Sequence, residues 1–217
     1  MELDQSIRGS NRTGRKIDKS NPNAKVIAMN RLHQAVFIFS VIGLAWLLMM
    51  AIHELGHVLG ALISGGVVER VVLHPMTISR TDVVPNPNPL LVVWFGPILG
   101  CTLPILFVWI VSDTNVTAKS VAAFFAGFSL IANGAYISIG TMDQVGDCGV
   151  MIRHGSPVWL LVLFGGIAIA TGLFFWHRLG SVRGFLANPT WVNPQLAYGS
   201  LITLLMVLWI GFTFSPR

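Results

Sequence analysis

The chain alternates long apolar runs with short polar connections. Five runs carry few or no charged residues, and each is long enough to cross the hydrocarbon core of a bilayer, which is about 30 Å thick, at about 1.5 Å per helical residue. Their length and apolar character predict five transmembrane helices. The runs are Val36–Ile63, Leu90–Ser112, Ser120–Met142, Pro157–Trp176 and Leu196–Ser215.

Two connections between these runs have an unusual composition. Gly65–Pro89 is rich in β-branched residues and is broken by prolines, which predicts a short β-hairpin or edge strand near the membrane. Thr141–Ser156 is the only connection with two acidic residues close together, Asp143 and Asp147. The predicted fold is therefore an all-α multi-pass membrane protein, with about five transmembrane helices and a short membrane-associated β-hairpin after the first.

Composition supports a membrane location. Apolar residues make up 53% of the 217 residues and charged residues only 11%, with a mean hydropathy of +0.70. A soluble domain carries about 25% charged residues. A chain this poor in charge cannot cover its own surface with polar groups, so a lipid bilayer is its natural solvent. Only two cysteines occur, Cys101 and Cys148, and they indicate no disulfide framework.

The net charge of +5 is concentrated near the N-terminus, where seven of the fourteen Lys and Arg residues lie in the first 31 residues. This segment has no aromatic residues on which bases could stack, so we predict no nucleic-acid binding. We interpret residues 1–31 as a basic, disordered cytoplasmic tail. Across the whole chain, ten Lys and Arg then lie on the tail side of the membrane and four on the other. This asymmetry predicts a cytoplasmic N-terminus.

The first apolar run contains three strongly polar residues, His53, Glu54 and His57, arranged as an HExxH element. On a helix, positions i and i+4 share one face, so both imidazoles can bind one zinc ion. The glutamate can take a proton from the water that zinc activates and pass it to the leaving amine. Ionisable groups in a membrane helix are costly, and a shared metal ion compensates that cost. We predict one Zn²⁺ per chain, with His53 and His57 as ligands and Glu54 as the catalytic base.

A catalytic zinc needs a third protein ligand. The connection after the third run emerges on the same side of the membrane as His53. Within it we favour Asp147, because Gly146 and Gly149 allow the backbone to approach the first helix closely. Asp143 is the first alternative, or a carboxylate that supports a ligating histidine. The less favoured alternatives are His154, His74 and Asp82.

These motifs resemble those of the site-2-protease-type intramembrane zinc metalloproteases. In that family HExxH lies in one transmembrane helix and a distant Asp-Gly element supplies the third ligand. The resemblance covers roughly residues 36–154, through "HELGHVLGALISGG", the β segment "VVERVVLHPMTIS" and "WFGPILG", which contains Gly96 and Pro97. The last motif departs from the family pattern of Asn-x-x-Pro shortly before Asp-Gly. Asn133 lies 14 residues before Asp147 without a following proline, and Cys148 stands where the family has glycine.

The resemblance implies an intramembrane endopeptidase that hydrolyses peptide bonds in or near membrane-spanning segments of other proteins. It also implies that the β segment presents an edge to the substrate. The expected organisation is the tail, a metalloprotease core of residues 32–156, and two additional helices in residues 157–217. Two alternatives remain: a membrane zinc-binding protein for transport or sensing, and an inactive protease-like scaffold. The later apolar runs offer no ionisable residues for an ion path, and Glu54 is present, so the endopeptidase is favoured.

The third run is unusual in its small and polar residues. Its segment "FFAGFSLIANGAYISIG" spaces glycine, alanine and serine along one helix, which predicts close packing against a neighbouring helix. Asn133 is a polar group within this apolar run. We expect its side chain to hydrogen-bond to a neighbouring helix.

Overall fold

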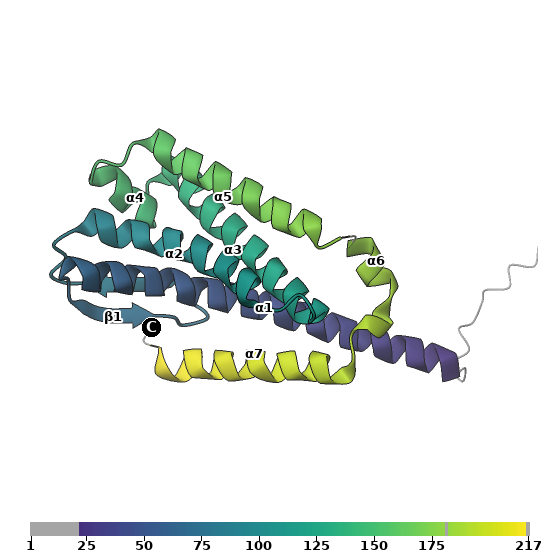
Figure 1. Ribbon diagram of the computed structural model, residues 1–217. Helices are drawn as coiled ribbons and strands as arrows, with labels where there is room; N and C mark the ends of the chain where they lie inside the picture. Colours follow the sequence, from purple (N-terminus) through teal and green to yellow (C-terminus); the bar gives the residue numbers. More distant parts are fainter. Residues whose placement is uncertain (1–21, 181, 216–217) are drawn as a thin grey trace, which may run out of the picture.

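Five long helices form the body of the protein in a computed structural model, which describes residues 22–180 and 182–215 (Figure 1). All five are long and apolar enough to cross a membrane. The expectation of a mostly helical, multi-pass protein with five membrane-spanning helices is therefore confirmed. The long helices are α1 (Pro22–Ser64), α2 (Pro89–Ile110), α3 (Val116–Asp143), α5 (Val158–Arg178) and α7 (Pro194–Phe214).

The predicted hairpin follows α1 directly. Strands β1 (Val68–Val72) and β2 (Arg80–Val83) pair in antiparallel fashion. The remaining short elements are helical: α4 (Gly146–Arg153), α6 (Val182–Ala187) and the 3₁₀ turn η1 (Pro189–Trp191). Figure 1 shows the hairpin and α4 at one end of the bundle and α6 at the other.

Helix α1 begins much earlier than expected. Residues 22–31 are helical, whereas the sequence predicted a disordered tail up to residue 31. Proline is well tolerated at the first position of a helix, as at Pro22. Tertiary contacts also hold this end: the Arg31 side chain donates to the carbonyl of Leu186, and Gln34 Nε2 donates to the carbonyl of Phe185 at 2.7 Å. The rest of the predicted tail, residues 1–21, lies outside the described residues.

Asparagine caps explain where three of the long helices start. Asn88 Oδ1 accepts from the Leu91 N–H at 3.1 Å at the start of α2. The Oδ1 atoms of Asn115 and Asn193 each accept from the backbone N–H three residues later, at 3.0 Å at the start of α3 and at 2.8 Å at the start of α7. Such a cap satisfies one of the backbone donors that have no partner within the helix. In α2 and α7 a proline follows the cap at the first helical position.

Helices α3 and α5 pack backbone to backbone. A Cβ atom added to Gly165 of α5 would lie 2.4 Å from the carbonyl oxygen of Gly134 in α3, and one added to Gly172 would lie 2.8 Å from that of Gly127. In lipid the helices gain little from burying apolar surface, so close packing of small residues is what stabilises their association. The prediction of tight packing along the third run is confirmed.

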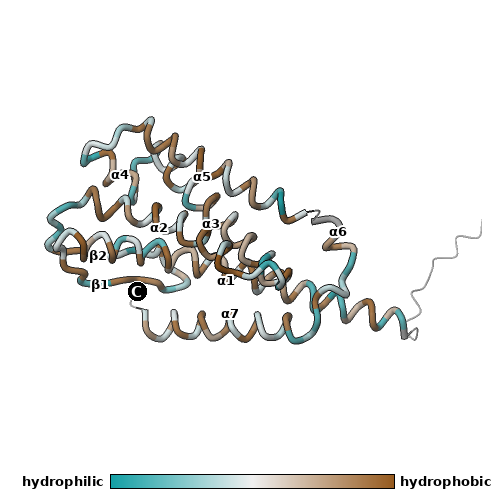
Figure 2. The backbone as a smooth tube through the Cα atoms, in the orientation of Figure 1, coloured by the Kyte–Doolittle hydropathy of each residue, from teal (hydrophilic) through white to brown (hydrophobic). Residues whose placement is uncertain are grey.

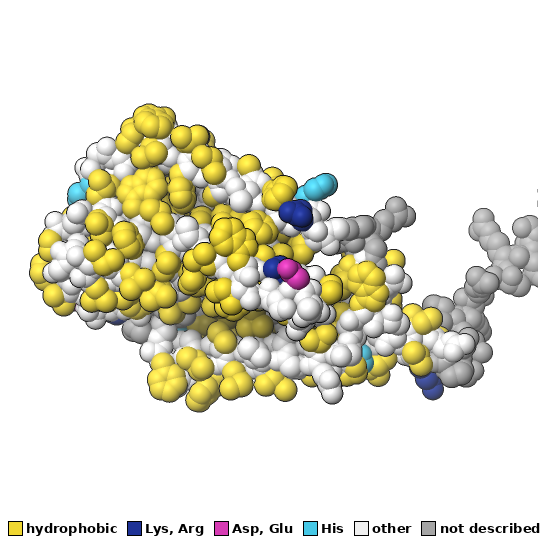
Figure 3. Space-filling model, viewed as in Figure 1, with side chains coloured by type: hydrophobic (Ala, Val, Ile, Leu, Met, Phe, Trp, Pro, Cys, Tyr) yellow, Lys and Arg dark blue, Asp and Glu magenta, His cyan; other side chains and the backbone are white. Residues whose placement is uncertain are grey.

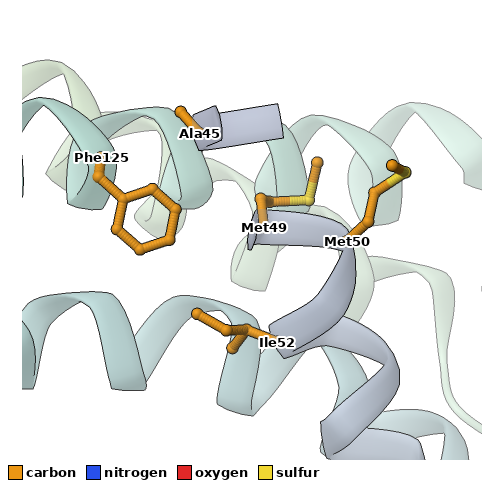
Figure 4. Packing of buried hydrophobic residues seen from close by; sticks show 5 residues of the cluster. All are labelled: Ala45, Met49, Met50, Ile52 and Phe125. Carbon is orange, nitrogen blue, oxygen red and sulfur yellow. The ribbon is translucent and has the colours of Figure 1, made fainter. Parts of the chain in front are cut away.

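Apolar side chains cover the outside of the bundle as well as its interior. Figure 2 shows hydrophobic residues along the lengths of the helices and hydrophilic ones mainly near their ends, and the face in Figure 3 is largely hydrophobic. Of α7, whose residues are all described, only Ala197 is buried. Inside, Phe125 of α3 belongs to one cluster with residues of α1 in the turns before His53 (Figure 4). These residues are Ala45, Met49, Met50 and Ile52.

Candidate metal centre

The HExxH residues lie together inside the bundle. His53, Glu54 and His57 are 7%, 3% and 6% exposed. One potential ligand atom from each lies within 4.8 Å of those of the other two. Their positions one turn apart on α1 produce this convergence, as expected for i and i+4. The cluster could therefore hold a metal ion.

Asp147 joins these histidines from a distant part of the chain. Helix α3 ends at Asp143, and the chain then turns through Gln144 and Gly146, both with positive φ (52° and 57°), into α4, whose first turn contains Asp147. Asp147 Oδ2 lies 2.8 Å from His53 Nε2 and 3.3 Å from His57 Nε2. Of the carboxylates considered from the sequence, the favoured one is thus in contact with both imidazoles.

The alternative third ligands have other surroundings. Asp143 is exposed at the end of α3, and His154 is exposed at the end of α4. Asp82 forms ion pairs with two arginines of the hairpin, at 3.1 and 3.3 Å. His74 is buried in the loop between β1 and β2, where its Nδ1 accepts a backbone N–H at 3.2 Å. Geometry therefore favours Asp147 over all four.

Hydrogen bonds orient both imidazole rings. His57 Nδ1 donates to the carbonyl oxygen of Val92 at 2.9 Å, and His53 Nδ1 donates to Asn133 Oδ1 at 2.6 Å. The Asn133 amide nitrogen donates in turn to the carbonyl of Ser129 at 2.9 Å, which directs the amide oxygen at His53. Because both partners are acceptors, each Nδ1 carries the hydrogen and each Nε2 presents its lone pair. The prediction that Asn133 bonds to a neighbouring helix is confirmed.

The converging atoms form a donor set suited to a cation. The Nε2 atoms of His53 and His57 both lie within 3.3 Å of one oxygen of Asp147. Three acceptors this close repel each other unless a positive charge lies between them. Two imidazole nitrogens and a carboxylate oxygen match the ligands of catalytic zinc sites. At ordinary zinc–ligand lengths such atoms lie about 3.3 Å apart in a tetrahedron; His57 Nε2 and Asp147 Oδ2 have this spacing, at 3.3 Å, and His53 Nε2 lies closer to the same oxygen, at 2.8 Å. The residues present thus fit zinc.

The charge of Asp147 agrees with this picture. Burial disfavours its charged form, but when the Nε2 atoms of His53 and His57 carry protons, their hydrogen bonds to the carboxylate outweigh that cost and hold the pKa of Asp147 well below its usual value. The carboxylate is therefore ionised at neutral pH. A positive charge beside it, whether a proton on a histidine or a metal ion, accounts for its stability in a site only 19% exposed.

Glycines of α2 leave the space that the polar side chains occupy. A Cβ atom on Gly96 would lie 2.3 Å from Cε1 of His57, and one on Gly100 would lie 2.7 Å from Oδ1 of Asn133. Any larger residue at either position would collide with an imidazole or with the amide that orients one. The glycine of the "GP" pair thus has a direct steric role in the centre.

Packing beneath α4 holds Asp147 in place. Cys148 and Met151 are fully buried in a cluster with Ile137 of α3. The Cys148 thiol donates to the carbonyl of Ile137 at 3.2 Å and lies where a Cβ of Gly140 would be. Burial, together with the nearby charge of Asp147, raises the pKa of Cys148 to about 11. The cysteine that departs from the family pattern is therefore a neutral packing residue.

Sequence reasoning missed two further residues of the centre. The Thr81 hydroxyl of β2 donates to Glu54 Oε2 at 2.8 Å. The Tyr136 hydroxyl oxygen of α3 accepts from the backbone N–H of Asp147 at 3.2 Å. One signal was available for Tyr136: it lies three residues after Asn133, so both face the same side of α3.

Comparison with known proteins gives one result. A family model described as Peptidase M50B-like matches residues 25–138, more than half of the chain. The match includes HExxH, the hairpin, Gly96 and Asn133, and it ends before Asp147. Searches of curated proteins and of solved structures found no match.

Proposed function

The chain belongs to the Peptidase M50B-like family of site-2-protease-type membrane metallopeptidases, and from this premise we propose that it is a zinc-dependent endopeptidase. It hydrolyses peptide bonds in or near membrane-spanning segments of other proteins. The observation that carries this proposal is the convergence of His53 Nε2, His57 Nε2 and Asp147 Oδ2 beside Glu54.

His53, His57 and Asp147 would hold one zinc ion. When bound, zinc would lower the pKa of a water molecule toward neutrality, so that hydroxide becomes available as a nucleophile, and would polarise the carbonyl under attack. The Nδ1 bonds to Val92 and Asn133 keep the two rings in the tautomer that binds a metal. The remaining steps fall to residues of the chain.

Glu54 is the proton carrier. Its Oε2 accepts the Thr81 hydroxyl, and we therefore assign the proton of the attacking water to Oε1, the oxygen without this donor. Glu54 then gives this proton to the leaving amine nitrogen, which completes cleavage of the peptide bond. Burial of Glu54 at 3% exposure strengthens these electrostatic interactions, because few water molecules compete for the carboxylate.

The hairpin would align the substrate. Among the described residues the sheet has two strands, so β1 and β2 each have one unpaired edge. An unwound substrate segment can pair with such an edge through backbone hydrogen bonds. The hairpin also contacts the catalytic helix, since Thr81 bonds to Glu54. A strand bound there would therefore lie beside the candidate centre.

The proposed orientation has a cytoplasmic N-terminus. The starts of α1 and α3 and the segment around α6 lie at one end of the bundle, and the hairpin and α4 lie at the other (Figure 1). Ten of the fourteen Lys and Arg residues belong to the first end or its tail. The positive-inside rule then favours a cytoplasmic location for that end and puts the metal centre near the opposite face.

Zinc analysis combined with Glu54→Gln tests the function. We expect about one zinc per purified chain in both proteins. The wild type should cleave a single-span model peptide in detergent or liposomes, whereas the variant should retain zinc and lose cleavage. A zinc-free wild type, or cleavage that survives Glu54→Gln, would refute the proposal. Zinc flux into liposomes that survives the substitution would instead support the transport alternative.

A further inference from the structure

One hydroxyl of the hairpin faces the buried carboxylate of Glu54. Side chains alternate between the two faces of a strand, so Thr81 lies on the opposite face of β2 from Arg80 and Asp82. Those two neighbours pair with each other at 3.3 Å, and Asp82 also pairs with Arg70 of β1 at 3.1 Å. Thr81 instead turns to α1 and donates to Glu54 Oε2 at 2.8 Å.

We propose that Thr81 is a positioning residue for Glu54, an inference that rests on the function proposed above. A carboxylate with two free oxygens can rotate and offer either one to the attacking water. The Thr81 hydroxyl occupies Oε2, so the carboxylate keeps one orientation and Oε1 remains for the proton. Glu54 is only 3% exposed, so water cannot readily replace a missing donor at Oε2.

The bond also makes the position of Glu54 depend on the hairpin. On its other side the hairpin is held by the end of α7: the Leu73 N–H donates to Ser215 Oγ at 2.7 Å. The ring of Phe212 packs edge-on against His74, with centroids 5.0 Å apart. The hairpin is thus fixed between α1 and α7. A substrate strand that pairs with it is therefore bound to the element that orients the catalytic carboxylate.

The family match does not extend to this arrangement as a whole. It covers α1 and the hairpin but ends at residue 138, before α7 begins at Pro194. The support of the hairpin by α7 is therefore a feature of this chain's own C-terminal helix. It links a segment outside the matched region to Glu54 through two sets of contacts, one from Leu73 and His74 to α7 and one from Thr81 to Glu54.

Thr81→Val and Thr81→Ser separate positioning from packing. Valine has nearly the shape of threonine but no donor, and serine keeps the donor. Loss of a hydrogen bond to a charged group typically changes an equilibrium or rate constant by a factor of about 10 to 100, so we expect Thr81→Val to lower kcat by about that factor. KM and zinc content should stay at the wild-type values, and Thr81→Ser should recover most of kcat. Thr171→Val is the matched control, since Thr171 is half-buried on α5, as Thr81 is on β2, and its hydroxyl donates to a carbonyl of its own helix at 2.8 Å.

A second readout requires neither zinc nor turnover. The chain has three glutamates, Glu2, Glu54 and Glu69. Selective ¹³C labelling of their carboxyl carbons therefore gives three resonances, and Glu54→Gln identifies the buried one. Thr81→Val should shift that resonance in the metal-free protein, and Thr171→Val should leave it in place.

Each outcome decides one of the two claims. An unshifted Glu54 resonance, or a Thr81→Val protein with wild-type kcat, overturns the inference and leaves the proposed endopeptidase intact. Loss of zinc in Thr81→Val, or failure of Thr81→Ser to recover kcat, also overturns it, because the role would then be structural. A wild type that holds zinc but does not cleave refutes the proposed function, whatever the resonance of Glu54 does.

Discussion

Replacing Gly96 with alanine tests whether the close approach of α2 shapes the metal centre. The added Cβ would lie 2.3 Å from His57 Cε1 and 2.6 Å from His57 Nε2. Carbon atoms in ordinary contact are about 3.5–4.0 Å apart, so the ring must move by about 1 Å. A shift of α2 away from the ring would relieve the clash but would also stretch the hydrogen bond of His57 Nδ1, because the Val92 carbonyl that accepts it at 2.9 Å belongs to the same helix.

The displacement is large on the scale of a metal site. Zinc–ligand distances are held to about 0.2 Å, so a shift of about 1 Å breaks or strains the bond from His57. Changes to groups that orient a ligand typically cost about 10- to 100-fold in metal affinity, or about 1.4–2.8 kcal/mol. The substitution itself favours the helix by about 0.5–1 kcal/mol, since alanine loses less backbone entropy than glycine. Weaker zinc binding therefore cannot be attributed to helix propensity.

Zinc affinity in detergent micelles, measured by competition with a chromophoric chelator, is the direct assay. Gly166→Ala is the matched control: Gly166 is exposed on α5, and a Cβ there would meet nothing within 4 Å. We expect the Gly96 variant to bind zinc about 10- to 100-fold more weakly and the control to equal the wild type. Wild-type affinity in Gly96→Ala would refute the steric argument and the assignment of His57 as a ligand in this geometry.

Two further predictions concern the helices around the centre. Asn133→Leu removes the acceptor for His53 Nδ1 and should weaken zinc binding by about 10- to 100-fold in the same competition assay. Asn133→Asp keeps an acceptor oxygen for His53 Nδ1 and should weaken zinc binding less. Equal zinc affinities of the Leu and Asp variants would contradict the orienting role of Asn133. Gly165→Leu should lower the unfolding free energy in detergent by about 1–3 kcal/mol or more, because its Cβ would lie 2.4 Å from the Gly134 carbonyl oxygen. Gly166 is the next residue and faces open space, so Gly166→Leu should leave the unfolding free energy unchanged. Equal losses of unfolding free energy in both variants would show that the packing of α3 and α5 does not depend on this contact.

The layout of the membrane helices was predictable because it depends on local properties. The length of each apolar run, its lack of charge and the prolines and asparagines at its ends are all visible in sequence, and the structure reproduces all five runs as helices. The hairpin was equally visible in its β-branched residues. The start of α1 was not, because the contacts of this end with the distant α6, from Arg31 and Gln34, form only in the folded chain.

In the candidate centre, too, some residues were predictable from local sequence and others were not. His53, Glu54 and His57 lie within one turn of one helix, so their convergence follows from helical geometry alone. Asp147 and Asp143 offer the same carboxylate, so the sequence could rank Asp147 higher only on its position and its neighbouring glycines. Its contact with both histidines depends on how α3, the turn at Gly146 and α4 pack. Thr81, like Tyr136, reaches the centre only through tertiary contacts. Sequence thus determined the membrane helices and the histidine pair of the candidate metal centre. Tertiary structure decided what completes and orients them, because those partners lie tens of residues away and meet only when the helices pack.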